Sequence, residues 1–79
     1  MIYVYILSSL RVEGERYVGI TSDLRKRLAY HNSGRSTHTA KYMPWKVETY
    51  IAFSDEEKAR GFERYLKTGS GWAFSLKRF

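Results

Sequence analysis

The sequence predicts a small α+β domain, with a three-stranded antiparallel sheet flanked by helices in the order β-β-α-β-α-α. Three observations lead to this fold class. Two strand-like runs flank a polar turn near the start, a third run alternates apolar and polar residues, and helix-start signals precede the remaining segments. With 79 residues, the chain is expected to form one domain over residues 1–79.

The first two strands are expected at Ile2–Leu7 and Tyr17–Ile20, which are rich in β-branched and aromatic residues. The polar segment Arg11–Glu15 between them contains Gly14. This pattern is typical of a β-hairpin with a longer loop.

Thr21-Ser22-Asp23 is expected to open a helix, with hydroxyls available for the N-cap and an acid in the first turn. Leu24 and Leu28 supply its apolar stripe, and Asn32-Ser33-Gly34 predicts its end. The segment Ser36–Pro44 that follows is polar and basic, which predicts a loop.

The third strand is expected at Trp45–Phe53, where apolar and polar positions alternate. Ser54 and Glu57 then stand at capping-box spacing, which predicts a helix to about Thr68 with Gly69 as its C-terminal stop. A short last helix is expected at Trp72–Arg78.

Basic residues outnumber acidic ones, with 14 Lys and Arg against 8 Asp and Glu and a net charge of +6. Residues 24–47 hold six basic residues and no acid, and residues 58–79 hold six basic residues and one acid. Such segregation favours a polyanionic partner, with nucleic acid ahead of an anionic membrane. The alternative is a basic surface that serves solubility alone.

The chain has no cysteine, which excludes a disulfide framework and a thiolate metal site. The apolar run Met1–Leu10 lacks a basic leader and is too short to span a bilayer. We therefore expect no membrane partner and a cytoplasmic location.

Arg27 and His31 lie one turn apart on the first expected helix and share a face beside Leu24, whereas Arg25 and Lys26 point away. The planar guanidinium of Arg27 suits a phosphate. The alternatives are an arginine with its head in water and a histidine that caps the helix C-terminus.

Glu63 falls on the apolar face of the next expected helix, the face that Ala59, Phe62 and Leu66 define. A carboxylate there needs a partner or a metal. Two readings stay open: an ion pair with Lys67, four residues on, or a Mg²⁺ site that uses one carboxylate, waters and substrate phosphate.

Five segments together resemble the GIY-YIG nuclease superfamily, especially its small stand-alone bacterial members and the amino-terminal nuclease domain of the excinuclease. Val4-Tyr5-Ile6 and Tyr17-Val18-Gly19 are similar to its two naming motifs. Residues 23–28 with His31-Asn32 resemble the helix that carries the family's arginine and histidine. Ala59–Lys67 resembles the segment that bears its metal-binding glutamate, and Tyr65–Gly71 resembles the tail of the stand-alone group. The glycine that names the first motif is Tyr3 here.

The resemblance implies metal-dependent hydrolysis of DNA, in which Glu63 binds one Mg²⁺ or Mn²⁺ and Arg27 neutralises the scissile phosphate. Tyr5 or Tyr17 would take the proton from water, and the resemblance favours Tyr5. A phenol has a pKa of about 10, so this role requires a nearby cation that favours the phenolate. His31 would orient a tyrosine or the water, or assist proton transfer.

Arg35, His38 and Lys41 are expected to bind the DNA backbone from the loop. No attached sequence-specific DNA-binding domain is expected, so the substrate would be chosen by DNA structure, in repair or processing. The other functions that stay open are a nucleic-acid-binding module that does not cut and a basic protein-interaction domain.

Overall fold

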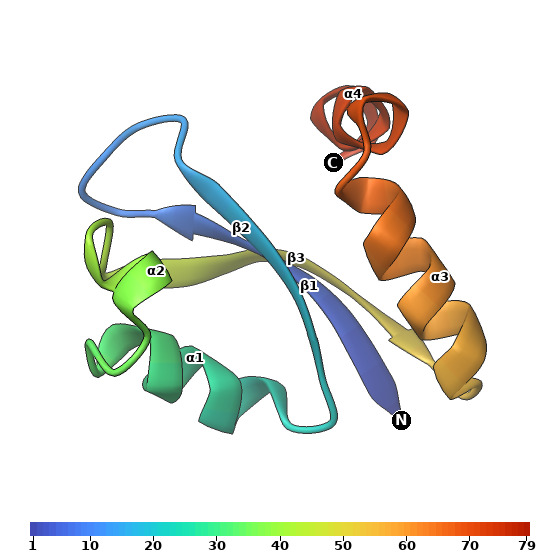
Figure 1. Cartoon of the computed structure of the whole chain (residues 1–79), viewed down its shortest axis with the longest axis horizontal. Coiled ribbons are helices and arrows are strands. Elements are labelled where there is room, and N and C mark those ends of the chain that lie inside the picture. Colours follow the sequence, from blue (N-terminus) through green and yellow to red (C-terminus); the bar gives the residue numbers. More distant parts are fainter.

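The computed structural model describes residues 1–79, and its elements form the expected α+β fold, a three-stranded antiparallel sheet with helices (Figure 1). The sheet has the strand order β2-β1-β3, so β1 is central and pairs antiparallel with both neighbours. The elements are β1 (Ile2–Ser9), β2 (Arg16–Thr21), α1 (Leu24–Asn32), α2 (Thr37–Ala40), β3 (Trp45–Phe53), α3 (Glu56–Leu66) and α4 (Gly69–Arg78). None of the helices has the length and apolar character needed to cross a membrane.

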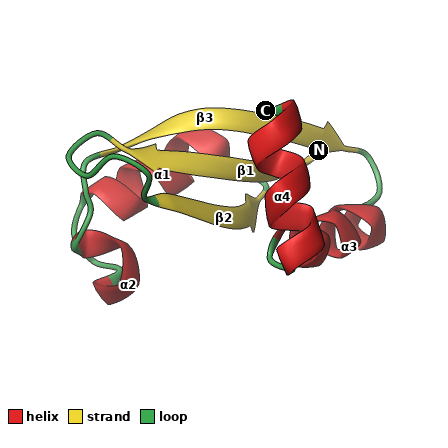
Figure 2. Cartoon of the chain, turned by 90° about the horizontal axis from the view of Figure 1, so that it is seen from above, coloured by secondary structure: helices red, strands yellow, loops and turns green.

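Helices cover both faces of the sheet, with α1 and α2 on one side and α3 and α4 on the other (Figures 1 and 2). Alternate residues of β1 serve the two cores because side chains on a strand point to opposite faces. Val4 and Ile6 pack with residues of α3, and Tyr5 and Leu7 pack with residues of α1. The sheet is therefore buried on both sides, which explains why the middle of β1 is apolar without alternation.

A register shift in β3 lets this one strand contribute to both cores. Its exposure alternates along the strand as predicted. However, Val47 packs with Leu7 on the α1 side, whereas Phe53 packs with Val4 on the α3 side. The pairing with β1 shifts between Ile6 and Leu7, and such a bulge changes the face to which the following residues point.

The first long helix, α1, begins after Asp23 as predicted, but its N-cap is Asp23 itself and not a hydroxyl residue. The Asp23 side chain accepts a hydrogen bond of 3.0 Å from the backbone N–H of Lys26. The start of α3 differs from the prediction. Asp55, not Ser54, is its N-cap, and its carboxylate accepts from the backbone N–H of Lys58 at 3.1 Å. An Asp and a Ser are equally good caps, so composition alone did not separate the two neighbours.

The last two helices meet earlier than predicted. α3 ends at Leu66, and α4 begins at Gly69, so this glycine starts a helix where a helix stop was predicted. Thr68 is the N-cap of α4. A Cβ on Gly71 would collide with the backbone oxygen of Tyr65, so only glycine permits this close turn between the helices.

The loop predicted at Ser36–Pro44 contains a short helix, α2, so the observed order is β-β-α-α-β-α-α. Its Thr39 is buried, and the indole N–H of Trp45 donates to the Thr39 carbonyl oxygen at 2.9 Å. A helix of four residues is too short to show a periodic pattern in the sequence.

Candidate active site

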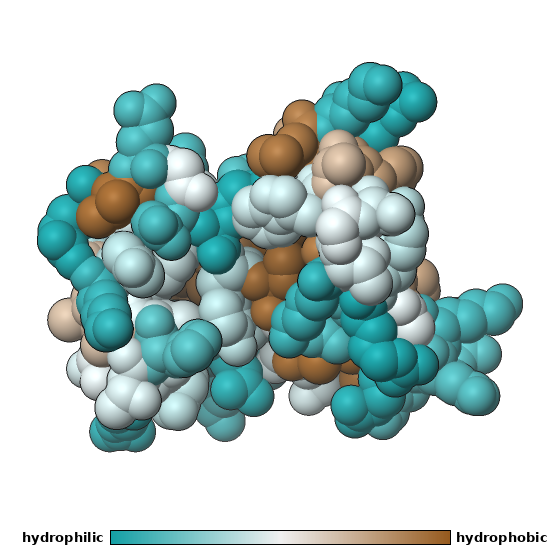
Figure 3. Space-filling view, turned by 45° about the horizontal axis from the view of Figure 1, so that its top comes forward, coloured by the Kyte–Doolittle hydropathy of each residue, from teal (hydrophilic) through white to brown (hydrophobic).

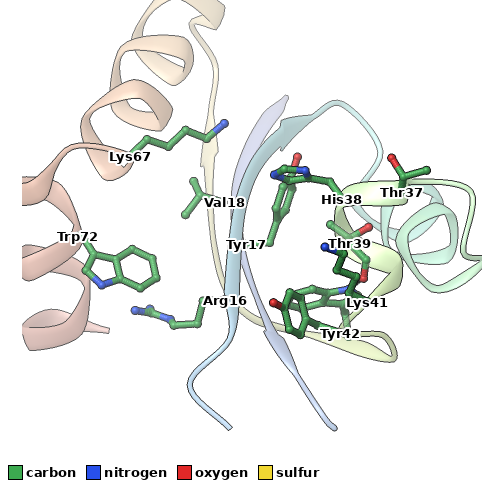
Figure 4. Close-up of a pocket in the computed structure, with 11 residues that line it drawn as sticks. Arg16, Tyr17, Val18, Thr37, His38, Thr39, Lys41, Tyr42, Lys67 and Trp72 are labelled. Atoms are coloured by element: carbon green, nitrogen blue, oxygen red, sulfur yellow. Dashed lines mark hydrogen bonds between the residues drawn. The ribbon is translucent and has the colours of Figure 1, made fainter. Parts of the chain in front are cut away.

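A cleft of about 850 Å³ lies along the free edge of β2 (Figure 4). One wall comes from α2 and the residues after it, and the other from the junction of α3 and α4. Four basic residues line it, and no Asp or Glu does: Arg16, His38, Lys41 and Lys67. In Figure 3, hydrophilic side chains cover much of the surface on this side, with hydrophobic ones between them. The cleft therefore offers a polyanion a concave, cationic surface.

Tyr17 presents the phenol of the second motif to this cleft. It is half-buried, and its side chain lies on the α2 side of β2, opposite the side to which Val18 points (Figure 4). His38 and Lys41 line the same wall. Three of the residues selected from the sequence thus share one cleft.

Tyr5, the phenol of the first motif, lies behind Tyr17 and is only 2% exposed. It pairs across the ladder with Gly19, and a Cβ on this glycine would collide with the phenol oxygen of Tyr5. The tip of the Tyr5 ring therefore occupies space that any other residue at position 19 would fill. The group that closely approaches the backbone of Gly19 is therefore the phenol of Tyr5.

His31 joins Tyr5 to α2 through two hydrogen bonds. Its Nε2 lies 3.0 Å from the phenol oxygen of Tyr5, and its Nδ1 lies 3.0 Å from the hydroxyl of Thr39. The imidazole ring is also 4.9 Å from the Tyr17 ring, centroid to centroid. Burial of all three hydrogen-bonded partners makes this a fixed support under the ring of Tyr17.

Burial shifts both titratable groups of this support toward their neutral forms. It raises the pKa of Tyr5 far above the usual phenol value, and the charges of Tyr17 and Glu63 add to this rise while Arg27 opposes it. Burial, and secondarily the charge of Arg27, lowers the pKa of His31. The charge of Arg27 thus acts on the pKa of both residues, and that of Glu63 on the pKa of Tyr5.

Arg27 itself is exposed on α1, with its guanidinium carbon 5.4 Å from the centre of the Tyr30 ring. It lines a second hollow, of about 580 Å³, together with Lys26 and Arg35. Arg35 therefore lies apart from His38 and Lys41, with which the sequence grouped it. Lys26, which was expected to point away from the apolar stripe of Leu24 and Leu28, is exposed and borders the same hollow as Arg27.

Glu63 is half-buried on α3 and forms an ion pair with Lys67, with 2.5 Å between Oε2 and Nζ. The carboxylate does not line the cleft, but Lys67 does (Figure 4). No group of three or more His, Cys, Asp or Glu residues stands ready for a metal ion. A lone carboxylate still fits Mg²⁺, which commonly takes one or two protein oxygens and completes its shell with water and phosphate.

The sequence did not point to Arg16, a basic residue that also lines the cleft. Its guanidinium donates to Glu48 at 2.7 Å and lies 4.7 Å from the centre of the Trp72 ring, and its side chain is 8% exposed. These contacts attach α4 to the sheet. Because Arg16, Glu48 and Trp72 are far apart in the chain, no local signal predicts them together.

Residues 1–72 match the family described as the GIY-YIG catalytic domain. The chain belongs to this family. By sequence resemblance Tyr5 and Tyr17 fall in its two naming motifs, and Tyr5 packs against Gly19 of the second one. Membership gives the chain a nuclease-type fold.

Curated relatives of this GIY-YIG chain carry the name UPF0213 protein. This chain is 38% identical over 66 residues to a UPF0213 protein from Streptococcus pneumoniae, and the match covers 82% of this chain and 65% of that protein. It is 36% identical to one from Streptococcus pyogenes and 35% identical to one from Lacticaseibacillus paracasei, covering 70% and 72% of those proteins. The chain thus spans just under two thirds of the pneumococcal relative. No solved structure matches.

Proposed function

We propose that this chain is a divalent-metal-dependent endonuclease that hydrolyses phosphodiester bonds in DNA, with residues 1–79 acting as one catalytic domain. The observation that carries the proposal is the position of Tyr17, whose phenol lines a cationic cleft while its ring rests 4.9 Å from that of His31. The nuclease-type fold of the GIY-YIG family supports the same function.

Tyr17 is the residue that we assign to proton transfer, although family resemblance favoured Tyr5. A general base has to reach the attacking water and exchange its proton near the working pH. Tyr5 is buried, hydrogen-bonded to His31, and has a raised pKa, whereas Tyr17 borders the cleft. In the reaction, the phenol oxygen of Tyr17, after giving its own proton to solvent, takes a proton from the attacking water as the water oxygen bonds to phosphorus. The bond to the leaving oxygen breaks, and that oxygen takes a proton from solvent.

Glu63 is the residue that we assign to hold one Mg²⁺ or Mn²⁺. Its carboxylate is paired with Lys67, which lines the α3 side of the cleft, and its charge contributes to the raised pKa of Tyr5. A bound ion would polarise the phosphate and stabilise charge on the leaving oxygen. Glu63 contributes a rigid, helix-borne oxygen for this purpose.

We assign the remaining basic residues to contacts with the DNA backbone. Arg27 is exposed, so its guanidinium is free to leave the Tyr30 ring and neutralise the scissile phosphate. Arg35 would contact flanking phosphates from the hollow of Arg27, and His38 and Lys41 would do so from the cleft. Such contacts read the backbone, so the substrate would be selected by DNA structure, in repair or processing in the cytoplasm.

The test is a cleavage panel of supercoiled, single-stranded, nicked and branched DNA with and without Mg²⁺ or Mn²⁺. We expect metal-dependent products from the wild type and a loss of about a hundredfold or more in Glu63→Gln and Arg27→Ala. Glu57→Gln removes an exposed carboxylate of the same helix and should cut normally. Full cleavage by purified Glu63→Gln would remove the metal role from this residue.

A second candidate function is a nucleic-acid-binding module that does not cut. The ion pair of Glu63 with Lys67 favours it, because the carboxylate already has a cationic partner within the chain. This candidate predicts salt-sensitive binding without metal-dependent products on any substrate of the panel. A basic protein-interaction domain would instead bind none of these nucleic acids at low salt.

A further inference from the structure

Lys67 covers the carboxylate of Glu63 on the side of the cleft. Its Nζ contacts Oε2 of Glu63, and no other ion pair or hydrogen bond involves that carboxylate. The Lys67 side chain is 52% exposed and lines the cleft, whereas the Glu63 side chain is 15% exposed and does not. In Figure 4 the lysine extends from the end of α3 toward β2, into the cleft.

A divalent ion at Glu63 has to compete with this ammonium group. Both cations need the same carboxylate, which belongs to no cluster of acidic residues that could hold them together. Two like charges within a few ångströms also repel each other. The ion therefore binds fully only when Lys67 leaves.

The cleft supplies Lys67 with another partner when DNA is bound. The ammonium sits on a flexible four-carbon stem and is a good point contact for phosphate. The remaining charged residues of the cleft are bases, so the displaced ammonium finds no other carboxylate there. A DNA phosphate is the partner that fits.

We infer that Lys67 is an exchangeable positioning residue, which pairs with Glu63 in the metal-free protein and with a DNA phosphate once a divalent ion occupies Glu63. The exchange couples the two ligands, because DNA draws the lysine off the carboxylate and the ion releases the lysine for DNA. Such coupling is reciprocal. The inference deepens the proposed function and rests on it.

The first measurement is Mn²⁺ affinity without DNA, by calorimetry or by the electron paramagnetic resonance signal of the free ion. Lys67→Met keeps the stem of the side chain but removes its charge, and it should bind Mn²⁺ about three to ten times more tightly than the wild type. Lys58→Met, which removes an exposed lysine of the same helix, should not do so. Lys67→Gln provides a second variant, and thermal unfolding checks that both fold.

The second measurement is DNA affinity in metal-free buffer, so that no cleavage interferes. Glu63→Gln frees Lys67, and should tighten binding about two- to fivefold more than the control Glu57→Gln. It should also steepen the salt dependence by about 0.9 for one added phosphate contact. Both gains should vanish in the double variant Glu63→Gln/Lys67→Met.

The inference is overturned if Lys67→Met binds Mn²⁺ no more tightly than Lys58→Met, or if the double variant keeps the gain in DNA affinity. A wild type that cleaves DNA alongside such results leaves the proposed function standing and removes only the role of Lys67. Conversely, tighter Mn²⁺ binding by Lys67→Met with no cleavage by any protein supports the exchange while the nuclease proposal fails. If neither the wild type nor Lys67→Met binds Mn²⁺, with or without DNA, both proposals are overturned.

Discussion

The phenol of Tyr5 and the imidazole of His31 form a buried hydrogen bond of 3.0 Å between β1 and α1, and each residue is 2% exposed. This contact connects the first GIY-YIG motif to the helix of Arg27. It also supports Tyr17 from below, since the Tyr17 ring packs on the same imidazole. The motif tyrosines thus differ in environment, one buried and one facing the cleft.

Tyr5→Phe is expected to destabilise the fold by about 1–3 kcal/mol, because Nε2 of His31 loses its partner while it stays buried. Urea denaturation measures the free energy of unfolding. Tyr50→Phe, which removes a phenol from an exposed residue of β3, is the control and should be nearly neutral. Equal stability of the two variants would contradict the structural role of the Tyr5 hydroxyl.

His31 predicts a pH dependence of stability. Its pKa in the folded chain lies below 6.5, so between these two values the unfolded chain binds a proton that the folded chain does not. The contribution of His31 to stability is complete above pH 6.5 and is lost as the pH falls from 6.5 to the folded pKa. Urea denaturation at about pH 7.5 and about pH 5.5 should show a larger decrease for the wild type than for His31→Gln. His38→Gln, at an exposed position, should keep the wild-type decrease.

Gly19→Ala is expected to destabilise the chain by about 1–3 kcal/mol, because the new methyl group would displace the phenol of Tyr5 or shift β2. Gly61 on α3 has open space around its Cβ position, so Gly61→Ala should stabilise by up to about 1 kcal/mol through helix propensity. Thermal unfolding compares the two. A neutral Gly19→Ala would mean that Tyr5 does not need the space above this glycine.

Much of the fold could be predicted because its signals are local. The hairpin, the alternation in β3 and the start of α1 all depend on residues close together in the chain. Both motif tyrosines and Glu63 were also selected from local patterns, and the family resemblance then implied a role for each. What local patterns predict well is thus the elements and the candidate residues on them.

Contacts between distant segments decided the rest. The buried pairing of Tyr5 with His31 and Thr39 depends on how α1 and α2 dock on the sheet, which no periodicity reveals. The contribution of β3 to both hydrophobic cores follows from a bulge in its pairing with β1. The cleft wall of Arg16 and Trp72 likewise joins segments that only the tertiary fold brings together.

The central claim is that Tyr17 and Glu63 act on the same DNA phosphodiester bond, and single-turnover cleavage with saturating Mg²⁺ tests it most directly. The rate should fall about a hundredfold or more in Tyr17→Phe and in Glu63→Gln. The double variant should be little slower than the slower single one, because both residues serve one step. Tyr50→Phe should cut at the wild-type rate. Cleavage by Tyr17→Phe at that same rate would contradict the account.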